Sequence, residues 1–549
     1  MRIGLLAVTA SGRSAAELLQ QALPEARHYA LGELPGAWLE CDGLVLFLAA
    51  GAVVRLVAPL LQGKTTDPGV VCVDEGRQYA VALLGGHGGG ANELAETVAN
   101  ILDAQPVVTT ATDATGLPGL DTLGWPVEGA VAAVSRAMLD GEPVRLDAHA
   151  VWPLPPMPVG VDGDHVLAVT DRLLALDCLT AILRPPSLVV GVGASRGVPA
   201  EEIEQLLERT LADAGLSVLS VKALATATAK ADEPGIVELA RRRGWPLTAY
   251  DSEVLAAVAV PNPSTAPLAA IGTPSVAEAA ASLQGELIVP KAKSAMATVA
   301  VARVRPRGRL ALVGLGPGAR DLLSPRAATE LRRASVWVGL DQYVEQVRDL
   351  ARPGTRMLIT GLGQEQERAN SAVLEAQRGH AVALIGSGDS GVYAMASPAL
   401  EAAGDDIDVV GVPGITAALA ASNLLGAPLG HDHASISLSD LHTPWPAIEA
   451  RVRAVAEGDL VVTFYNPRSR GRDWQLAKAV AMLLERRPAT TPVGIVTDAS
   501  RSTETVVLTT LGELDVQQVT MLACVVVGSS QSRIVAGRFV TPRGYTWHT

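Results

Sequence analysis

The chain has 549 residues, which is too long for one hydrophobic core and predicts several domains. Hydrophobic residues make up 48% of it and aromatic residues only 3%, so its cores must be built mainly from Ala, Val and Leu. This composition favours layered α/β folds. The net charge is −13 and there is no long basic run, which argues against nucleic acid as a partner.

The amino-terminal block, residues 1–142, begins with an apolar run that continues into the amphipathic stretch 14–22. This pattern predicts a strand, a turn and a helix rather than a signal peptide. Further strands are expected at 44–48 and 70–73. The cysteines stand apart in the sequence, at Cys41, Cys72, Cys178 and Cys524. Because they have no CxxC spacing and no histidine cluster, we expect reduced thiols, no metal and a cytoplasmic protein.

A proline-rich stretch, 151–161, lies within the segment 143–186, which we interpret as a linker or crossing connection. Proline lacks the amide donor that a helix or central strand requires. The second block, 187–303, opens with the apolar sequence LVVGVG, a predicted strand. A helix is expected over 199–214, because Pro199 and the acidic residues that follow suit a helix amino terminus.

The third block, 309–549, alternates apolar strands with helical stretches and predicts two α/β layers with a ligand cleft at the strand ends. Its strands are expected at 309–314, 381–386, 406–412, 459–464, 491–496 and 521–527. The apolar run 409–430 is as long as a membrane span, but prolines and glycines interrupt it. We therefore expect a buried strand, turn and helix there, and no membrane partner.

Two glycine-rich turns follow apolar strands of this block, at 314–318 (GLGPG) and at 386–393 (GSGDSGVY). A residue without a Cβ lets the backbone approach a ligand closely. A single turn of this kind is weak evidence, because a plain tight turn has the same composition and the GxGxxG pattern is not satisfied. Two such turns in one domain indicate a binding site.

These turns resemble those of the tetrapyrrole (uroporphyrin/precorrin type) methyltransferases. The segments VVGVPGITAALAAS, HDHASISLSDLHTPW, VVTFYNPRSRGR and VTPRGY resemble the precorrin-3B C-17 methyltransferase branch. The resemblance covers about 309–549, with Ser390 as a departure where many relatives carry Pro or Ala. It implies S-adenosylmethionine as cofactor, a precorrin substrate, no metal, and a homodimer through this domain. The residues that it implies for the cofactor are Gly316, Pro317, Gly386, Gly388, Asp389, Val392, Tyr393, Thr416, Tyr465 and Asn466. For Tyr465, ordinary packing at a strand end is the alternative.

The substrate of that branch carries many carboxylates, and guanidinium groups bind carboxylates in a bidentate manner. The candidate cations are Arg468, Arg470, Arg472 and Arg533, with a solvated surface loop as the alternative. Ring contraction also requires proton transfer, for which Asp440 and His442 are candidates. They flank Leu441 and would share one face if the strand continued there. Asp440 could instead cap the following helix.

Polar residues interrupt the apolar pattern of the first block at 64–68, 85–93 and 109–113. These segments, with GVGASRG, ATATAKADEPG and VPKAKSAMATVAVAR, resemble the cobalt-precorrin-5A hydrolase family over most of 40–303. The resemblance implies lactone opening by an activated water, with His87 and Asp113 as candidate bases and Asp67 and Glu93 as the alternatives. Substrate contacts are expected from Lys64, Asn92 and Glu93, and also from Lys291 and Lys293.

The sequence thus predicts a multidomain α/β enzyme, with domains at 1–142, 187–303 and 309–549. The expected function is C-17 methylation of precorrin-3B, or cobalt-precorrin-3, with ring contraction, joined to lactone opening on a later intermediate. Two alternatives stay open. The amino-terminal half could be a non-catalytic tetrapyrrole-binding module, or the methylase could act at another precorrin position or on RNA or protein.

Overall fold

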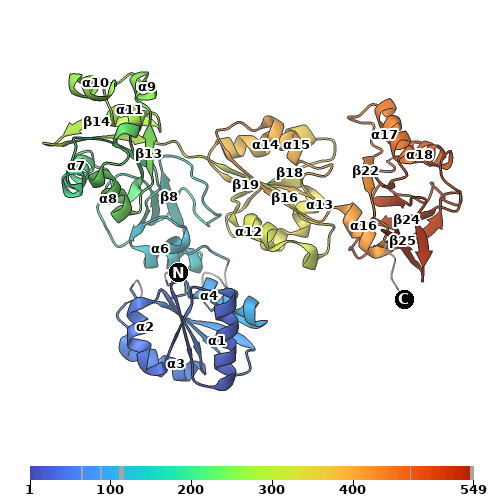
Figure 1. Cartoon of the computed structure of the whole chain (residues 1–549), viewed down its shortest axis with the longest axis horizontal. Coiled ribbons are helices and arrows are strands. Elements are labelled where there is room, and N and C mark those ends of the chain that lie inside the picture. The colour runs from blue at the N-terminus through green and yellow to red at the C-terminus, as the bar shows by residue number, and fades with distance from the viewer. Residues whose placement is uncertain (64–65, 87–88, 110–115, 470, 545–549) are drawn as a thin grey trace. The chain divides into compact units, whose positions relative to one another are not determined.

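The computed structural model describes residues 1–63, 66–86, 89–109, 116–469 and 471–544. The chain divides into two compact units, and Figure 1 labels their helices and strands. Unit 1 comprises Met1–Ala150 and Met157–Pro306, and unit 2 comprises Val151–Pro156 and the chain from Arg307 onward. Both units consist of sheets covered by helices, so the expected α/β class is confirmed.

Unit 1 begins with a six-stranded sheet in the order β2-β1-β3-β4-β5-β6. Strands β1 to β4 run parallel to one another, whereas β5 pairs antiparallel with β4 and parallel with β6. The strands are β1 (Ile3–Ala7), β2 (Arg27–Tyr29), β3 (Gly43–Phe47), β4 (Gly69–Val73), β5 (Tyr79–Leu84) and β6 (Gln105–Val107). The helices are α1 (Ala10–Ala22), α2 (Leu34–Glu40), α3 (Ala50–Val57) and α4 (Ala91–Leu102). Thr9 begins α1 by accepting a hydrogen bond from the Gly12 amide, which confirms the expected strand, turn and helix.

A four-stranded sheet follows, in the order β7-β10-β9-β8, with one helix. Its elements are β7 (Val127–Gly129), α6 (Val131–Asp140), β8 (Val144–Ala148), β9 (His165–Val169) and β10 (Thr180–Leu183). Three of these strands fall in 143–186, so that segment is part of a folded sheet and not the linker that its prolines predicted. The prolines themselves lie between β8 and β9, outside the ladder, which is why they do not interrupt it.

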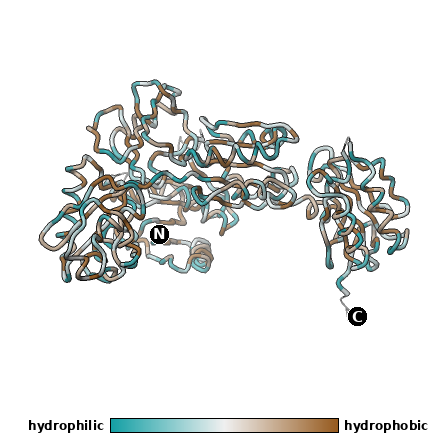
Figure 2. Tube along the Cα trace, turned by 90° about the horizontal axis from the view of Figure 1, so that it is seen from above, coloured by the Kyte–Doolittle hydropathy of each residue, from teal (hydrophilic) through white to brown (hydrophobic). Residues whose placement is uncertain are grey.

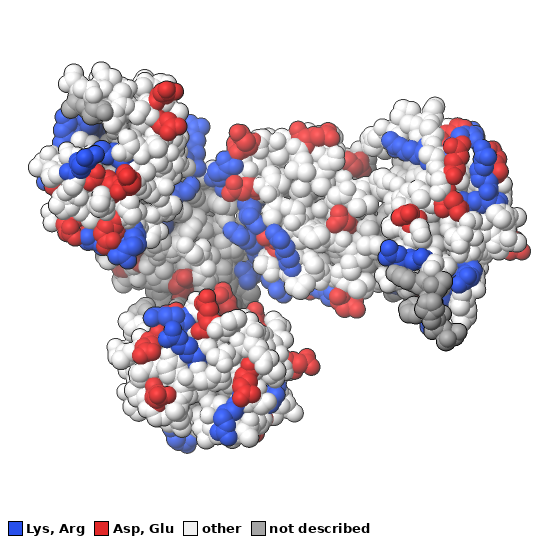
Figure 3. All heavy atoms as spheres, in the orientation of Figure 1, with Lys and Arg blue, Asp and Glu red and all other residues white. Residues whose placement is uncertain are grey.

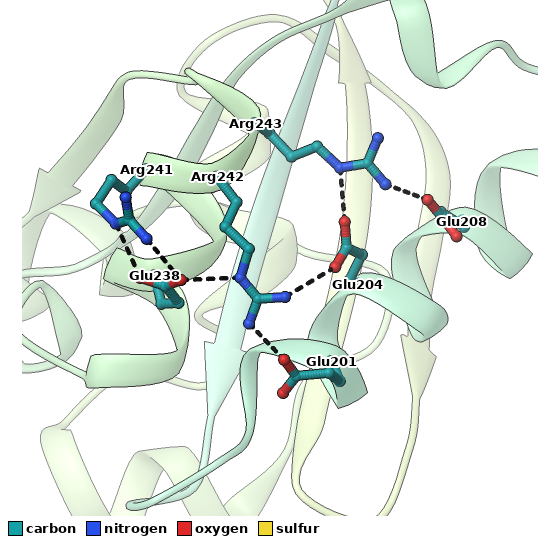
Figure 4. A network of polar contacts seen from close by, with 7 residues as sticks. All are labelled: Glu201, Glu204, Glu208, Glu238, Arg241, Arg242 and Arg243. Atoms are coloured by element: carbon teal, nitrogen blue, oxygen red, sulfur yellow. Dashed lines mark hydrogen bonds and ion pairs between the residues drawn. The ribbon is translucent and has the colours of Figure 1, made fainter.

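The third sheet of unit 1 has the order β13-β12-β11-β15-β14, with β11, β12 and β13 parallel. Its strands are β11 (Leu188–Ala194), β12 (Val221–Ala227), β13 (Leu247–Tyr250), β14 (Glu286–Lys293) and β15 (Ala297–Arg303). Its helices are α7 (Ala200–Asp213), α8 (Pro234–Arg243), α9 (Ser252–Ala256), α10 (Thr265–Ile271) and α11 (Ala277–Ser282). Pro199 occupies the N-cap of α7, as predicted. Ion pairs between glutamates of α7 and arginines of α8 join these two helices (Figure 4).

Unit 2 contains an all-parallel sheet in the order β18-β17-β19-β16-β20. Its strands are β16 (Arg309–Gly314), β17 (Val336–Leu340), β18 (Arg356–Thr360), β19 (Ala381–Gly386) and β20 (Asp408–Val412). Its helices are α12 (Pro325–Arg333), α13 (Asp341–Gln346), α14 (Glu365–Gln377) and α15 (Ala396–Ala402). Strands β16 and β19 have the predicted bounds.

The second layer of unit 2 is a mixed sheet in the order β22-β23-β26-β24-β25, beside a small sheet β21-β28-β27. The strands are β21 (Gly426–Ala427), β22 (His433–Ser437), β23 (Val461–Tyr465), β24 (Pro492–Thr497), β25 (Thr505–Thr510), β26 (Ala523–Val527), β27 (Arg533–Val535) and β28 (Arg538–Val540). The helices are α16 (Ala417–Leu425), α17 (Trp445–Glu457) and α18 (Gln475–Leu484). The apolar run 409–430 forms β20, a turn and α16, as expected.

Apolar and polar stretches alternate along the trace (Figure 2), and the fully buried strands of both units are rich in Val, Leu and Ile. On the face shown in Figure 3, basic and acidic side chains are interspersed, without a large area of one sign. None of the helices that the structure describes has the length and apolar character of a membrane span.

Candidate functional site

The main candidate site is a cavity of about 360 Å³ in unit 2, a size in the range of cofactor sites, about 300–1,000 Å³. It lies where the parallel strands β16 and β19 end. Both predicted glycine turns follow these neighbouring strands, and they bond to each other. The Gly316 amide donates to the Gly388 carbonyl at 3.0 Å, and the Gly388 amide donates to the Gly316 carbonyl at 2.8 Å. The sheet therefore brings the two turns to one edge, as the sequence predicted.

A third turn, at Gly414, packs so closely against these two that only glycine fits there. A Cβ on Gly414 would lie 2.0 Å from the Gly388 carbonyl oxygen. Gly388 itself has a φ of +66°, in the left-handed region. The carboxylate of Asp389 fixes the same turns, because it accepts from the Gly391 amide at 2.8 Å and from the Gly414 amide at 3.0 Å. Asp389 thus joins the second glycine turn to the turn at Gly414 without itself lining the cavity.

A pair of tyrosines lines another side of the cavity. The hydroxyl of Tyr465, the last residue of β23, lies 2.6 Å from Thr416 Oγ1 and accepts from the Ala418 amide at 2.8 Å. Tyr393 has a φ of +52° and donates to the Ser435 carbonyl at 2.8 Å. The two rings are 5.1 Å apart. Burial raises the pKa of both hydroxyls, so both stay neutral donors near neutral pH.

Most of the residues predicted for the cofactor lie in the wall of this cavity. Those that line it are Pro317, Gly386, Gly388, Val392, Tyr393, Thr416, Tyr465 and Asn466. Gly316 and Asp389 support the turns without lining it. The wall also leaves room beside Gly386, because a Cβ there would meet only Ala394, at 3.9 Å. Glycine backbone, apolar side chains and hydroxyl groups in one cavity fit the mixed polarity of S-adenosylmethionine.

Sequence reasoning missed several residues of the wall, including Arg368, Asp498 and Arg501. Arg501 Nε donates to the Pro317 carbonyl at 3.1 Å, and the Ala319 amide donates to Ser500 Oγ at 3.1 Å. These bonds join the loop after β24 to the first glycine turn. The polar run DASRST directly after a predicted strand was the signal that could have identified this loop.

The remaining predicted residues of unit 2 that the structure describes do not line the cavity. Arg468 binds the Gln517 carbonyl at 2.8 Å and its side-chain oxygen at 3.0 Å, Arg533 lies on the exposed strand β27, and Arg470 is outside the described residues. Arg472 Nε lies 4.0 Å from an Asp440 oxygen.

The premise that placed Asp440 and His442 on one strand face was wrong, because β22 ends at Ser437. Asp440 accepts a hydrogen bond from Gln475 Nε2 at 3.0 Å, and His442 is exposed in the following loop. The alternative role for Asp440 is also not seen, since α17 begins after Pro444 with no side-chain cap.

In unit 1, a cavity of about 500 Å³ is lined by parts of two predicted polar clusters, Thr66–Pro68 and Gly89–Gly90. Asp67 accepts from the Gln62 amide at 3.0 Å and the Gly63 amide at 3.2 Å. Asn92 and Glu93 lie in the first turn of α4, where the Asn92 amide donates to the Gly86 carbonyl at 3.0 Å. Of the other predicted residues of this half, Lys64, His87 and Asp113 lie outside the described residues, whereas Lys291 and Lys293 lie on β14.

Family models match three segments of the chain. They are described as cobalamin synthesis G N-terminal, at residues 33–113, cobalamin synthesis G C-terminus, at 188–302, and tetrapyrrole (corrin/porphyrin) methylases, at 309–515. A probable cobalt-factor III C(17)-methyltransferase of Salmonella typhimurium is 46% identical over 241 residues, which are 43% of this chain and 99% of that protein. The chain belongs to the tetrapyrrole methylase family.

The amino-terminal half of this tetrapyrrole methylase has relatives of its own. A cobalt-precorrin-5A hydrolase of Priestia megaterium is 35% identical over 303 residues, which are 49% of this chain and 81% of that protein. The amino-terminal half therefore belongs to the cobalamin synthesis G family, and the chain is a fusion of the two. Among solved structures, the methyltransferase CobJ is 34% identical with a TM-score of 0.42, over 43% of this chain and 100% of that one.

Proposed function

We propose that unit 2 transfers a methyl group from S-adenosylmethionine to C-17 of precorrin-3B, or of its cobalt-containing counterpart, with contraction of the macrocycle. The observation that carries the proposal is the cavity at the ends of β16 and β19, because eight of the residues predicted for the cofactor converge there. The C(17)-methyltransferase of Salmonella typhimurium, matched over nearly its whole length, supports the choice of position.

S-adenosylmethionine, when bound, supplies an electrophilic methyl group. The protein's contribution is to hold a nucleophilic ring carbon in line with that group and to exclude water. The glycine turns at 314–318 and 386–393 allow close approach of backbone amides. Thr416 and Tyr465, whose hydroxyl oxygens lie 2.6 Å apart, form another part of the wall. Proton transfer by Asp440 or His442, and carboxylate binding by Arg468, Arg470, Arg472 and Arg533, stay predictions.

The test is to incubate the purified chain with S-adenosylmethionine and either precorrin-3B or the cobalt-containing substrate, and to follow the tetrapyrrole by mass spectrometry. We expect the gain of one methyl group and the spectrum of a contracted ring. If neither substrate is methylated by protein that binds S-adenosylmethionine, the position or the substrate class is wrong. Which of the two substrates is methylated also shows whether cobalt is inserted before this step.

We propose that the amino-terminal half opens the lactone of a later corrin precursor, releasing a two-carbon aldehyde. The match to a cobalt-precorrin-5A hydrolase supports this function. The test is an aldehyde assay on the lactone substrate with the intact chain and with His87→Gln and Asp113→Asn. Release of aldehyde that these variants abolish supports catalysis. Binding of the substrate without aldehyde would instead make this half a tetrapyrrole-binding module.

We also propose that the protein acts in the cytoplasm, as a homodimer through unit 2, and without nucleic acid. The free thiols of Cys41, Cys72 and Cys524 are buried and unpaired with one another, which suits a reducing compartment. The net charge of −13 disfavours a polyanionic partner. Sedimentation velocity of the intact chain tests the dimer, and a monomer at working concentrations would contradict it.

A further inference from the structure

A second cavity in unit 1, of about 510 Å³, is lined by Lys291 and Lys293, the two lysines of this half that the sequence predicts to contact substrate. It lies at the carboxyl ends of the parallel strands β11 and β12, beside the turn that joins β14 to β15. The antiparallel pairing of β11 with β15 brings this turn to the end of β11, because Ala194 at the end of β11 pairs with Ala297 at the start of β15. Open α/β sheets bind ligands at this edge.

The charged side chains that line this cavity are all positive. Four cations line it, Arg196, Lys230, Lys291 and Lys293, and no Asp or Glu does. The segment 188–302 as a whole carries 9 Lys and Arg against 12 Asp and Glu, a net charge of −3. Nearly half of its cations therefore surround one cavity in an otherwise acidic domain. Like charges that face one another repel, so the arrangement indicates an anionic ligand.

Two of these cations lack a partner within the described part of the chain. The other two have partners: Lys230 Nζ lies 3.6 Å from a carboxylate oxygen of Glu233, and Lys291 Nζ donates to the Asn262 carbonyl at 2.5 Å. By contrast, Arg196 and Lys293 are exposed and make no side-chain hydrogen bond or ion pair among the described residues. The arginines of α8 in the same domain are neutralised by glutamates, as Figure 4 shows.

The wall between the cations suits an organic anion rather than a small inorganic one. Apolar side chains form part of it, among them Ile271, Val276 and Met296. The cations come from the loop after β11, from the turn after β12 and from β14, so the charge is distributed around the rim. A compact phosphate would use a single cluster of donors, whereas carboxylates on the edge of a flat macrocycle are separated by apolar surface.

We propose that this cavity binds the carboxylate-bearing edge of a tetrapyrrole, with Arg196 and Lys293 as the free carboxylate receptors. The site is distinct from the cavity at Thr66–Pro68 and from the methylase cavity of unit 2. The identity of the ligand as a tetrapyrrole rests on the proposed function, whereas its polycarboxylate character rests on the charges of the cavity.

The test uses the full chain and uroporphyrin, which has a carboxylate on every peripheral chain, with hydrogen exchange followed by mass spectrometry. We expect uroporphyrin to protect peptides that cover 193–198 and 291–298. In the double variant Arg196→Gln/Lys293→Gln, about ten times more uroporphyrin should be needed for the same protection, as expected from the loss of two solvent-accessible charged contacts. The charge-matched control is Arg209→Gln/Lys222→Gln, which removes two exposed cations of the same domain that do not line the cavity and should change nothing.

The other outcomes overturn the proposal in distinguishable ways. Protection confined to peptides of 309–549 would refute this site and leave the methylase proposal intact. If no peptide is protected, this site is refuted, and the methyl-transfer assay judges the proposed function separately. Protection of 193–198 and 291–298 by inorganic phosphate, with none by uroporphyrin, would make the cavity a phosphate site and refute the polycarboxylate ligand.

Discussion

Tyr465 connects the methylase cavity to the start of α16. Its hydroxyl accepts from the Ala418 amide and contacts Thr416 Oγ1, and its side chain is buried. We expect Tyr465→Phe to leave that amide unsatisfied, at a cost of about 1–3 kcal/mol, and to weaken S-adenosylmethionine binding roughly tenfold. Calorimetric titration measures this affinity. Tyr79→Phe, at an exposed position in unit 1, is the control, and unchanged affinity in Tyr465→Phe would show that the tyrosine only packs at the strand end.

Gly414 tests whether the cavity depends on close packing of its turns. A Cβ there would lie 2.0 Å from the Gly388 carbonyl oxygen, so Gly414→Ala must displace the second glycine turn. We expect S-adenosylmethionine affinity to fall more than about tenfold, because the turn forms part of the wall. Gly411→Ala is the control, since a Cβ at Gly411 has no neighbour within 4 Å. Equal affinity in the two variants would mean that the turn moves without affecting the ligand.

The glycine turns could be predicted because the signal is local: an apolar strand, then residues without side chains. Arg501 could not be assigned in the same way, because its contact with Pro317 joins residues 184 positions apart in the chain. Asp440 and His442 show the opposite error. Their alternation with Leu441 is compatible with one strand face, but β22 ends at Ser437, and an alternating pattern does not mark the end of a strand.

At the scale of elements, Arg184 holds the four-stranded sheet of unit 1 together. Its buried guanidinium binds Glu128 through Nε at 2.8 Å and donates to the Thr170 carbonyl at 3.1 Å and the Arg172 carbonyl at 2.5 Å. We expect Arg184→Met to destabilise this sheet by about 3 kcal/mol, because these acceptors lose a charged partner. Hydrogen exchange of peptides within 127–183 measures the loss. Arg145→Met, at an exposed position of β8, should have little effect, and an equal effect would contradict the structural role of Arg184.

The ion pairs between α7 and α8 predict a dependence on pH. Hydrogen bonds lower the pKa of Glu201, on α7, and of Glu238, on α8 itself, below the ordinary value of 4.5. The largest cause is a backbone hydrogen bond at Glu201 and the Arg241 side chain at Glu238, and Arg242 is the next cause at both. A carboxylate with a lowered pKa stabilises the fold above the ordinary value, and this contribution is lost as the pH falls through the lowered pKa. We therefore expect thermal stability to fall below about pH 4.5, and to fall less steeply in Arg242→Gln. Parallel pH profiles for the two proteins, measured by thermal denaturation, would contradict the coupling.

Strands and helices could be predicted where the local sequence indicates them, as the apolar runs do for β16 and β19, and as Pro199 and the acidic residues after it do for α7. The four-stranded sheet was not, because β8, β9 and β10 are short and separated by a proline-rich stretch that reads as a connection. Pairing between β9 and β10, and between β10 and β7, supplies the missing information, and such pairing is set by contacts distant in sequence.

At the scale of the whole molecule, the two units have separate cores, so a ligand of one unit should stabilise that unit alone. A ligand that binds only folded protein stabilises it by about 2.7 kcal/mol at a concentration a hundredfold above its Kd. We expect calorimetry to show two unfolding transitions, and S-adenosylhomocysteine to raise the temperature of one. Gly414→Ala should reduce that rise, which assigns the transition to unit 2. Equal shifts of both transitions would mean that the units unfold together, and the absence of any shift would contradict the assignment of the cavity to this cofactor.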